Sequence, residues 1–333
     1  MLGEPDLNPS LQRYRNPRGA LTLLALLGGL VAVATGCEEP LPVGPPEGNH
    51  PPFDGGDAYA LVERQVAFGP RVPGRSGHAA QLAWMLARLD STGLTVTADT
   101  FETPVSSGDT LRLTNVLVRV RPDLEDRVLL LAHWDTRPRS DQAQDPADRV
   151  LPVPGANDGA SGTAVLLVLA EIMAQEPPSV GVDLLWVDGE DYGPGAEDMF
   201  LGSERYAAGF DPAEGPTRGL LLDMVGDRDP AFPVEAYSAE RAPGVVAAIW
   251  GLAEELGLGD IVLDRLGPAV RDDHLPLNEA GLPTANLIDF SYGPGHAWWH
   301  TPEDTPDKVA AETLEVVGSL VAEWVYRGAT VGG

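Results

Sequence analysis

The sequence has only one cysteine, Cys37, among its 333 residues, so the chain cannot form an internal disulfide. Metal ligands, nucleophiles and redox couples built on paired thiols are excluded for the same reason. Basic residues are also scarce: 22 Lys plus Arg stand against 50 Asp plus Glu, which gives a net charge of -28. No basic stripe offsets this charge. The surface therefore repels phosphate groups, and we expect no nucleic-acid partner.

Two further features are missing. No apolar run reaches the roughly 20 residues that a membrane-spanning helix needs, and no repeat of about 20 to 50 residues indicates a solenoid or a propeller. The chain still has enough apolar residues for a sizeable core, because 43% of it is hydrophobic and 22% is charged. This composition predicts one large folded domain or two small ones, and we expect a monomer.

The amino terminus is typical of an exported protein. Three arginines precede the apolar run 20–34, which has the length of a secretory signal core and not that of an anchor helix. Small residues directly before Cys37 resemble a bacterial lipobox, in which the cysteine is lipidated and becomes the first mature residue. We expect residues 1–36 to be a lipoprotein signal peptide, and the membrane to be contacted only through lipidated Cys37, facing the periplasm or the cell exterior. The alternative is an ordinary signal peptide with an incidental cysteine.

Residues 37–56 are rich in Pro, Gly and acids and show no apolar periodicity. We expect them to form a tether. The folded catalytic domain is then expected over residues 57–330.

From residue 57 onward the apolar residues alternate between helical and strand spacing. Helices are predicted over 57–68, 76–89, 160–174, 245–256 and 309–326, with Asp57 and Ser76 as caps of the first two. Strands are predicted over 113–120, 128–132, 182–187, 220–224 and 283–288. This alternation indicates an α/β fold with a mostly parallel sheet covered on both faces. Ligands of such sheets bind beyond the carboxyl ends of the strands.

Acids and histidines follow several of these predicted strands. They are His133 and Asp135, Asp158, Glu190 and Asp191, Asp223, and His300. If they converge, their carboxylate oxygens and imidazole nitrogens suit a zinc ion. Each has another interpretation: Asp158 could form an Asx turn, Glu190 and Asp191 a solvated turn, and His300 could be a satisfied buried histidine.

Six short motifs stand in the order and spacing of a known family. They are HWDTRP, GANDGASG, WVDGEDYG, FLGS, LLDMVG and WWHTPEDT, at residues 133–138, 155–162, 186–193, 200–203, 221–226 and 298–305. As a set they resemble the zinc-dependent exopeptidases of the M28 type, which include aminopeptidases and glutaminyl cyclases. The resemblance covers about residues 57–327. It implies a three-layer α/β/α sandwich with a mixed, mostly parallel central sheet.

The resemblance implies two alternative metal sites. In the aminopeptidases of the family two zinc ions share an aspartate, here Asp158, with His133 and Asp223 completing the site alongside Asp191 and His300. Glu190 would then activate a bridging water. The cyclases typically bind one zinc ion through the positions that match Asp158, Asp191 and His300. Asp191 stands where many members have Glu, but it is still a carboxylate.

The stretch RDDHLPLNEAGLPTANLI at residues 271–288 favours the cyclase, as do HWDTRP and a tryptophan directly before the zinc histidine. The expected activity is a glutaminyl-peptide cyclotransferase acting on peptides and proteins with N-terminal glutamine. The alternative is a di-zinc aminopeptidase. A third possibility is a lipoprotein that binds peptides without catalysis.

If the protein is a cyclase, each site residue has an expected role. Glu190 is the general base and then acid, Asp223 and Asp272 hold Glu190 and the tetrahedral intermediate through hydrogen bonds, and Trp299 walls the substrate pocket. Another interpretation of Asp272 and its two neighbours is a helix-capping cluster.

Overall fold

A computed structural model describes residues 50–331. The predicted signal peptide, Cys37 and most of the predicted tether lie outside the described residues. The folded part starts ahead of residue 57, because Phe53 is already buried in the core and helix α1 begins at Gly55. The Phe53 ring packs against Gly318, where a Cβ would lie 2.4 Å from the ring. This segment is therefore part of the domain and not of a tether.

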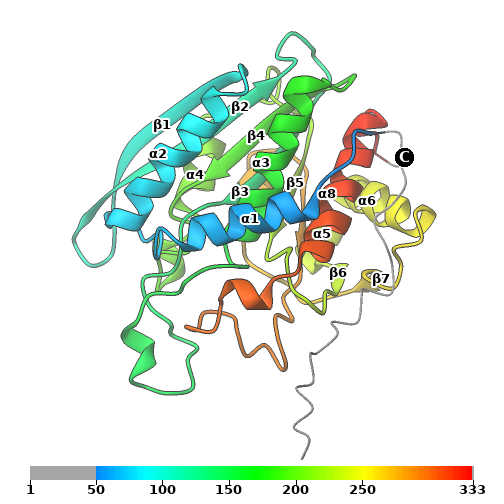
Figure 1. Cartoon of the computed structure of the whole chain (residues 1–333). Coiled ribbons are helices and arrows are strands. Elements are labelled where there is room, and N and C mark those ends of the chain that lie inside the picture. Colours follow the sequence, from blue (N-terminus) through cyan, green and yellow to red (C-terminus); the bar gives the residue numbers. More distant parts are fainter. Residues whose placement is uncertain (1–49, 332–333) are drawn as a thin grey trace, which may run out of the picture. The chain divides into compact units, whose positions relative to one another are not determined.

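The centre of the domain is a six-stranded sheet with the order β1-β2-β4-β3-β5-β8 (Figure 1). Strands β4, β3, β5 and β8 are parallel, whereas β2 runs antiparallel to both of its neighbours. A second, two-stranded parallel sheet pairs β6 with β7. The strand bounds are β1 Thr95–Pro104, β2 Thr110–Val120, β3 Arg127–His133, β4 Gly181–Val187, β5 Arg218–Asp223, β6 Phe232–Val234, β7 Val262–Leu266 and β8 Thr284–Ile288.

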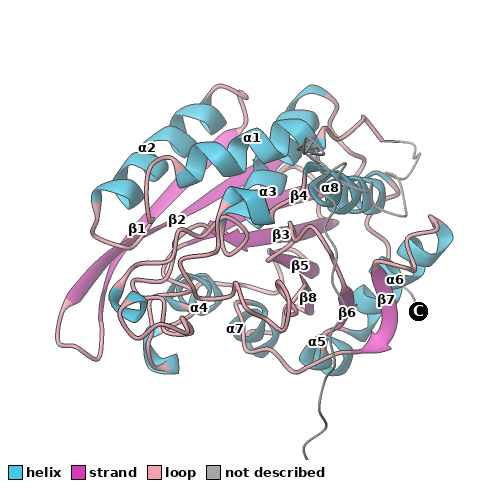
Figure 2. Cartoon of the chain, turned by 60° about the horizontal axis from the view of Figure 1, so that its bottom comes forward, coloured by secondary structure: helices cyan, strands magenta, loops and turns pink. Residues whose placement is uncertain are grey.

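Helices cover both faces of the six-stranded sheet. Figure 2 shows α1, α2, α3 and α8 over one face and α4 and α7 over the other. The bounds are α1 Gly55–Val66, α2 Ser76–Asp90, α3 Ala160–Gln175, α4 Leu201–Ala208, α5 Ala236–Arg241, α6 Pro243–Glu255, α7 His274–Glu279 and α8 Ala311–Tyr326, with 3-10 turns at Asp148–Val150, Ala196–Asp198 and Pro306–Lys308. The expected three-layer α/β/α arrangement with a mixed, mostly parallel sheet is confirmed.

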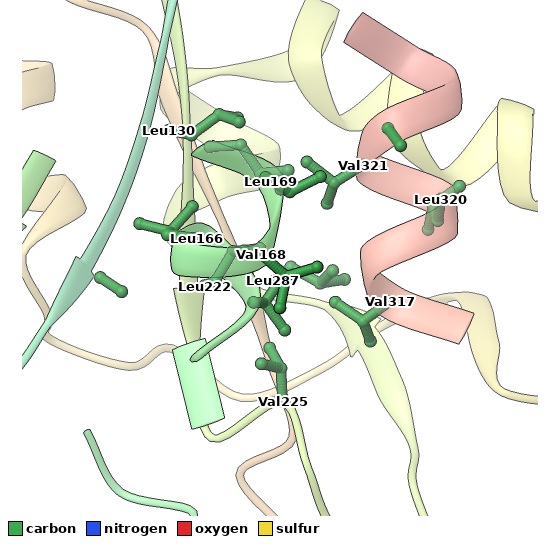
Figure 3. Close-up of a cluster of buried hydrophobic side chains, with 14 of the residues drawn as sticks. Leu130, Leu166, Val168, Leu169, Leu222, Val225, Leu287, Val317, Leu320 and Val321 are labelled. Atoms are coloured by element: carbon green, nitrogen blue, oxygen red, sulfur yellow. The ribbon is translucent and has the colours of Figure 1, made fainter. Parts of the chain in front are cut away.

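The core lies on both sides of the sheet because side chains of a strand alternate between its faces. Leu130 of β3 belongs to a hydrophobic cluster with side chains of α3 and α8, which Figure 3 shows. Its neighbours Leu129 and Leu131 belong to a second cluster on the opposite face, together with Leu277 of α7. This double burial explains why the strand has an uninterrupted apolar run. Each fully buried leucine contributes roughly 1.5–3 kcal/mol.

Some local predictions differ from the structure. Strand β1 was not predicted because it pairs on one side only and buries none of its residues, so it has no apolar alternation. Asp54, not Asp57, caps α1 by accepting the Asp57 backbone N–H at 3.0 Å. Ser76 is the first residue of α2 and makes no capping bond, since the cap position is Arg75. Across residues 50–331, no helix combines the length and apolarity needed to cross a membrane.

Candidate metal centre and active site

The predicted strand-end residues come together at the carboxyl edge of the parallel strands. His133 and Asp223 are the last residues of β3 and β5, and Glu190 and Asp191 follow β4. Asp158 is reached from β3 by a loop and stands directly before Gly159, the N-cap of α3. Gly159 has φ 95°, and a Cβ there would lie 2.6 Å from the Asp135 carbonyl oxygen. Glycine therefore lets this turn approach the end of β3 closely.

Two groups of three side chains can each hold a metal ion. In the triad Asp158–Asp191–His300, and likewise in the triad His133–Asp158–Asp223, one ligand atom of each residue lies within 4.8 Å of the others. Asp158 belongs to both triads. Its Oδ1 lies 3.1 Å from His133 Nε2, and its Oδ2 lies 3.6 Å from His300 Nε2. The two carboxylate oxygens therefore face different triads, and Asp158 does not simply form an Asx turn.

The distances fit zinc. Oxygen and nitrogen ligands about 2.0–2.2 Å from a tetrahedral zinc ion are about 3.4 Å from one another. His300 Nε2 lies 3.3 Å from Asp191 Oδ1, and His133 Nε2 lies 3.2 Å from Asp223 Oδ1. Asp191 Oδ2 is buried and has no hydrogen-bond partner in the protein, which leaves a lone pair for a cation. Both triads thus supply the donor atoms and the spacing that a zinc ion requires.

The charges of the ligands depend on burial and on one another. Burial, together with the neighbouring Asp191 charge, raises the pKa of Asp158. Burial alone would also raise the pKa of Asp191, but His300 and the Arg137 guanidinium hold it below its usual range. Burial alone would lower the pKa of His133, but the surrounding carboxylates raise it well above its usual value.

Glu190 is buried beside the two triads and is not part of a solvated turn. Its backbone N–H donates to Asp135 Oδ1 at 3.1 Å, and the Asp191 N–H donates to Asp135 Oδ2 at 3.3 Å. Asp135 therefore fixes the turn that carries both residues. Burial and the charge of Asp191 raise the pKa of Glu190 well above its usual value. A carboxyl group with a raised pKa can act as base and acid in turn near neutral pH.

Asp223 and Asp272 do not hold Glu190 as expected. In the described part of the chain no hydrogen bond joins Glu190 to either of them. Asp223 instead lies against His133, and Asp272 Oδ2 accepts a hydrogen bond of 2.7 Å from Asn286 Nδ2. Burial and the charge of Asp223 raise the pKa of Asp272 well above its usual value. The alternative of a capping cluster is not supported, because no side chain caps α7.

Trp299 lies flat on the candidate ligand His300. The two rings have centroids 3.8 Å apart and an interplanar angle of 21°. The centroid of the Trp299 ring also lies 4.7 Å from that of His296 and 5.2 Å from that of Phe290. The result is an aromatic wall, made of Phe290, His296 and Trp299, beside the Asp158–Asp191–His300 triad. His300 is not an ordinary core histidine, because its Nε2 faces two carboxylates, at 3.3 Å from Asp191 Oδ1 and 3.6 Å from Asp158 Oδ2.

Several supporting residues lie inside the six motifs but were not singled out from sequence. The Asp304 carboxylate, from WWHTPEDT, accepts the backbone N–H groups of Asn157 and Asp158 at 2.8 and 3.2 Å and the Tyr292 hydroxyl at 2.7 Å. Arg137, from HWDTRP, donates to Asp191 Oδ1 at 2.7 Å. Their positions in the motifs were the only sequence signal that they belong to the site. Their hydrogen-bond partners are too distant in the sequence to be identified without the fold.

Comparisons with known proteins show the family to which the chain belongs. The model of peptidase family M28 matches residues 115–325. Aminopeptidase YwaD of Bacillus subtilis is 30% identical over 210 residues, which are 61% of this chain and 41% of that protein, so the matched part of the chain spans less than half of this relative.

Two solved structures are similar over a larger share. A Zn-dependent exopeptidase from Parabacteroides distasonis has a TM-score of 0.79 at 33% identity, covering 83% of this chain and 99% of that chain. The glutaminyl cyclase of Bacteroides thetaiotaomicron, solved with N-acetylhistamine, has a TM-score of 0.79 at 35% identity, covering 84% of this chain and 99% of that chain. The fold neighbours imply zinc as the metal. Because the family model matches residues 115–325, which include every residue of both triads, the chain belongs to peptidase family M28.

Proposed function

We propose that the protein is a zinc-dependent glutaminyl-peptide cyclotransferase, which converts N-terminal glutamine of peptides and proteins to pyroglutamate and releases ammonia. The observation that carries the proposal is the aromatic wall beside the Asp158–Asp191–His300 triad, with Trp299 stacked on His300. Cyclisation needs a pocket that excludes water, because water at the same carbonyl would hydrolyse the amide. The similarity to a solved glutaminyl cyclase over most of the chain supports the same conclusion.

The reaction forms one carbon–nitrogen bond and breaks another. The α-amine of the N-terminal glutamine attacks the γ-carboxamide carbon of its own side chain, which closes a five-membered lactam, and the bond to the amide nitrogen breaks. Glu190 would take the proton that the amine loses and return it to the leaving nitrogen, which departs as ammonia. The buried position and raised pKa of Glu190 suit both steps. A zinc ion held by Asp158, Asp191 and His300 would supply Lewis acidity at the γ-carbonyl oxygen.

The remaining site residues act on the substrate. Asp272 has a raised pKa and lies near Asp223, so we assign this pair to hydrogen bonding with the tetrahedral intermediate. Trp299 would contact the glutamine side chain. No nucleophilic side chain is needed, because the substrate carries its own nucleophile.

The test is an assay with a peptide that carries N-terminal glutamine. Purified protein with zinc should release ammonia and lower the peptide mass by one ammonia. The same peptide with an acetylated amino terminus is the control, since its nitrogen cannot attack, and it should remain unchanged. If zinc-loaded protein releases no ammonia from the free peptide, the cyclase proposal is wrong.

A di-zinc aminopeptidase is the second candidate. The observation that favours it is the complete second triad, His133–Asp158–Asp223, which shares Asp158 with the first. In this case Glu190 would activate a water between two metal ions. Two zinc ions per chain, together with release of the aromatic amine from aminoacyl anilides, would support this activity and contradict the cyclase.

A further inference from the structure

The loop after β3 contacts two of the three side chains of the Asp158–Asp191–His300 triad. Arg137 is buried, and its Nη1 donates to Asp191 Oδ1 at 2.7 Å. Its Nε and Nη2 donate to Asp141 Oδ2 at 3.0 and 2.7 Å. The other oxygen of Asp141, Oδ1, lies 3.3 Å from His300 Nδ1. One guanidinium and one carboxylate therefore connect Asp191 to His300.

These contacts hold the ligands in place. Arg137 binds Asp191 Oδ1 with a strong, charge-assisted hydrogen bond, which fixes the carboxylate whose Oδ1 lies 3.3 Å from His300 Nε2 and whose Oδ2 has no partner in the protein. A carboxylate beside Nδ1 keeps the proton of a neutral imidazole on that nitrogen. The Asp141 carboxylate, 3.3 Å from Nδ1 but without good hydrogen-bond geometry, therefore favours the tautomer of His300 with its lone pair on Nε2, the atom that lies 3.3 Å from Asp191 and 3.6 Å from Asp158.

The backbone around the loop is also fixed. The Val153 N–H donates to the Arg137 carbonyl at 3.0 Å, and the Gln142 N–H donates to the His300 carbonyl at 3.3 Å. The guanidinium is planar and presents its donors in a rigid fork, so the positions of Asp141 and Asp191 depend on each other. A lysine at position 137 would keep the charge but could not make both contacts.

The second triad lacks such support. His133 Nδ1 lies 3.6 Å from Asp135 and 3.7 Å from Glu190 and, like His300 Nδ1, makes no hydrogen bond of good geometry in the described part of the protein. The difference lies in the carboxylates: Asp191 is held by the Arg137 guanidinium, whereas Asp223 lies against the other ligand of its own triad, His133. Because a ligand that is already oriented loses less freedom on binding, the two triads should differ in affinity.

We propose that Arg137 and Asp141 form a clamp, made of these two side chains, that orients Asp191 and His300 and makes the Asp158–Asp191–His300 triad the first to fill with zinc. Arg137 and Asp141 are positioning residues, since they act through the ligands. The inference rests on the metal site of the proposed function, but it concerns metal affinity and not turnover. A protein whose zinc affinity depends on Arg137 and Asp141 yet which lacks cyclase activity would contradict only the proposed function.

The test compares Arg137→Lys and Asp141→Asn with the wild type. Zinc affinity is measured on chelator-treated, refilled protein by competition with a chromophoric chelator, and zinc per chain is counted by native mass spectrometry. Loss of a supporting contact typically weakens metal binding about 10–100-fold, and we expect this loss for the first zinc ion in both variants. Arg139→Lys, in the same loop but outside the clamp, is the matched control and should bind zinc as the wild type does.

Melting of the metal-free proteins separates positioning from a structural role. The proposal predicts that zinc affinity falls in both variants. It also predicts that the melting temperature of metal-free Asp141→Asn stays near that of the wild type. Unchanged zinc affinity in both variants overturns the proposal, with or without a lower melting temperature. An equal loss of affinity in Arg139→Lys overturns it as well, because the effect would then belong to the loop and not to the clamp.

Discussion

The Ser203 hydroxyl donates a hydrogen bond of 2.5 Å to the Asp273 carboxylate, although the two residues are 70 positions apart. Both side chains are buried. Ser203 lies on α4 within the motif FLGS, and Asp273 directly precedes α7 beside Asp272. The bond therefore joins the FLGS motif, which has no charged residue, to Asp273, the neighbour of the site residue Asp272.

We expect Ser203→Ala to destabilise the fold. The other oxygen of Asp273 has no partner, so the substitution would leave a buried carboxyl group without a side-chain donor. Leaving such a group unsatisfied costs about 1–3 kcal/mol. Urea unfolding at neutral pH measures the loss. Ser107→Ala, in an exposed turn, is the control, and an equal change in both variants would contradict the assigned role.

Replacing Glu190 by Gln should remove catalysis without removing the metal. The amide keeps the shape of the side chain but cannot take up the proton, so kcat should fall by about 10²–10⁴-fold. Zinc content should not change, since neither triad includes Glu190. Glu197→Gln, at an exposed position in the loop after β4, is the control and should be fully active. Full activity of Glu190→Gln would contradict its role as proton carrier.

The two histidines separate the cyclase from the aminopeptidase. His300→Ala removes a ligand of the Asp158–Asp191–His300 triad, so it should abolish activity under either proposal. Bound zinc should be lost under the cyclase proposal, whereas a di-zinc hydrolase would lose one of its two zinc ions. Under the cyclase proposal His133→Ala should keep one zinc ion and part of the activity. A di-zinc hydrolase would instead lose one of two zinc ions and nearly all activity. Zinc counting together with steady-state kinetics on both variants measures the difference.

Acid stability should depend on Glu235, which caps α5. Its buried carboxylate accepts three backbone N–H groups, those of Tyr237, Ser238 and Val270, and lies 3.2 Å from His274 Nε2. Burial alone would raise the pKa of Glu235, but the contact with His274 and these backbone bonds lower it to about 2. Because this value is below the ordinary 4.5, the stabilisation is present above pH 4.5 and is lost as the pH falls toward 2.

The variant Glu235→Gln tests this dependence. It should be less stable than the wild type at pH 6, and the difference in unfolding free energy should shrink as the pH falls from about 4.5 toward 2. Urea titrations at several pH values measure it. Glu312→Gln, at an exposed position in the first turn of α8, is the control and should follow the wild type. A difference that is independent of pH would show that the charge of Glu235 is not involved.

Cys37 can be tested as the proposed lipid anchor. In a bacterial host grown with labelled palmitate, the wild-type protein should carry the label and enter the detergent phase on phase separation. Cys37→Ser should carry no label and be found in the aqueous phase. Export of an unlabelled wild-type protein would instead support the alternative of an ordinary signal peptide.

The apolar pattern predicted most of the sheet because β3, β4, β5 and β8 are buried on both faces and have few polar residues. It did not predict β1, which has no buried residue, or the short strands β6 and β7. These strands have no clear alternation of apolar and polar residues along the sequence. The ends of helices were also misplaced at Asp57 and Ser76, because a cap depends on side-chain geometry that composition alone does not specify.

The candidate ligands of the site could be predicted from the sequence, but the contacts that support them could not. His133, Asp158, Glu190, Asp191, Asp223 and His300 were all identified as candidates, because each follows a strand or lies in a motif. The contacts of Arg137 with Asp191 and of Ser203 with Asp273 were not, since they join segments 54 and 70 positions apart. The expected hydrogen bonds from Asp223 and Asp272 to Glu190 were wrong for the same reason.

The sequence by itself therefore determined the order of helices and strands, the family, and the residue types gathered at one edge of the sheet. Local spacing is enough for this, because burial periodicity and strand ends are properties of neighbouring residues. Only the tertiary structure decided which oxygen of Asp158 faces which histidine, and which ligands are oriented by Arg137 and Asp141. Hydrogen bonds and metal sites act over a few ångströms, and only the packed chain brings distant residues within that range.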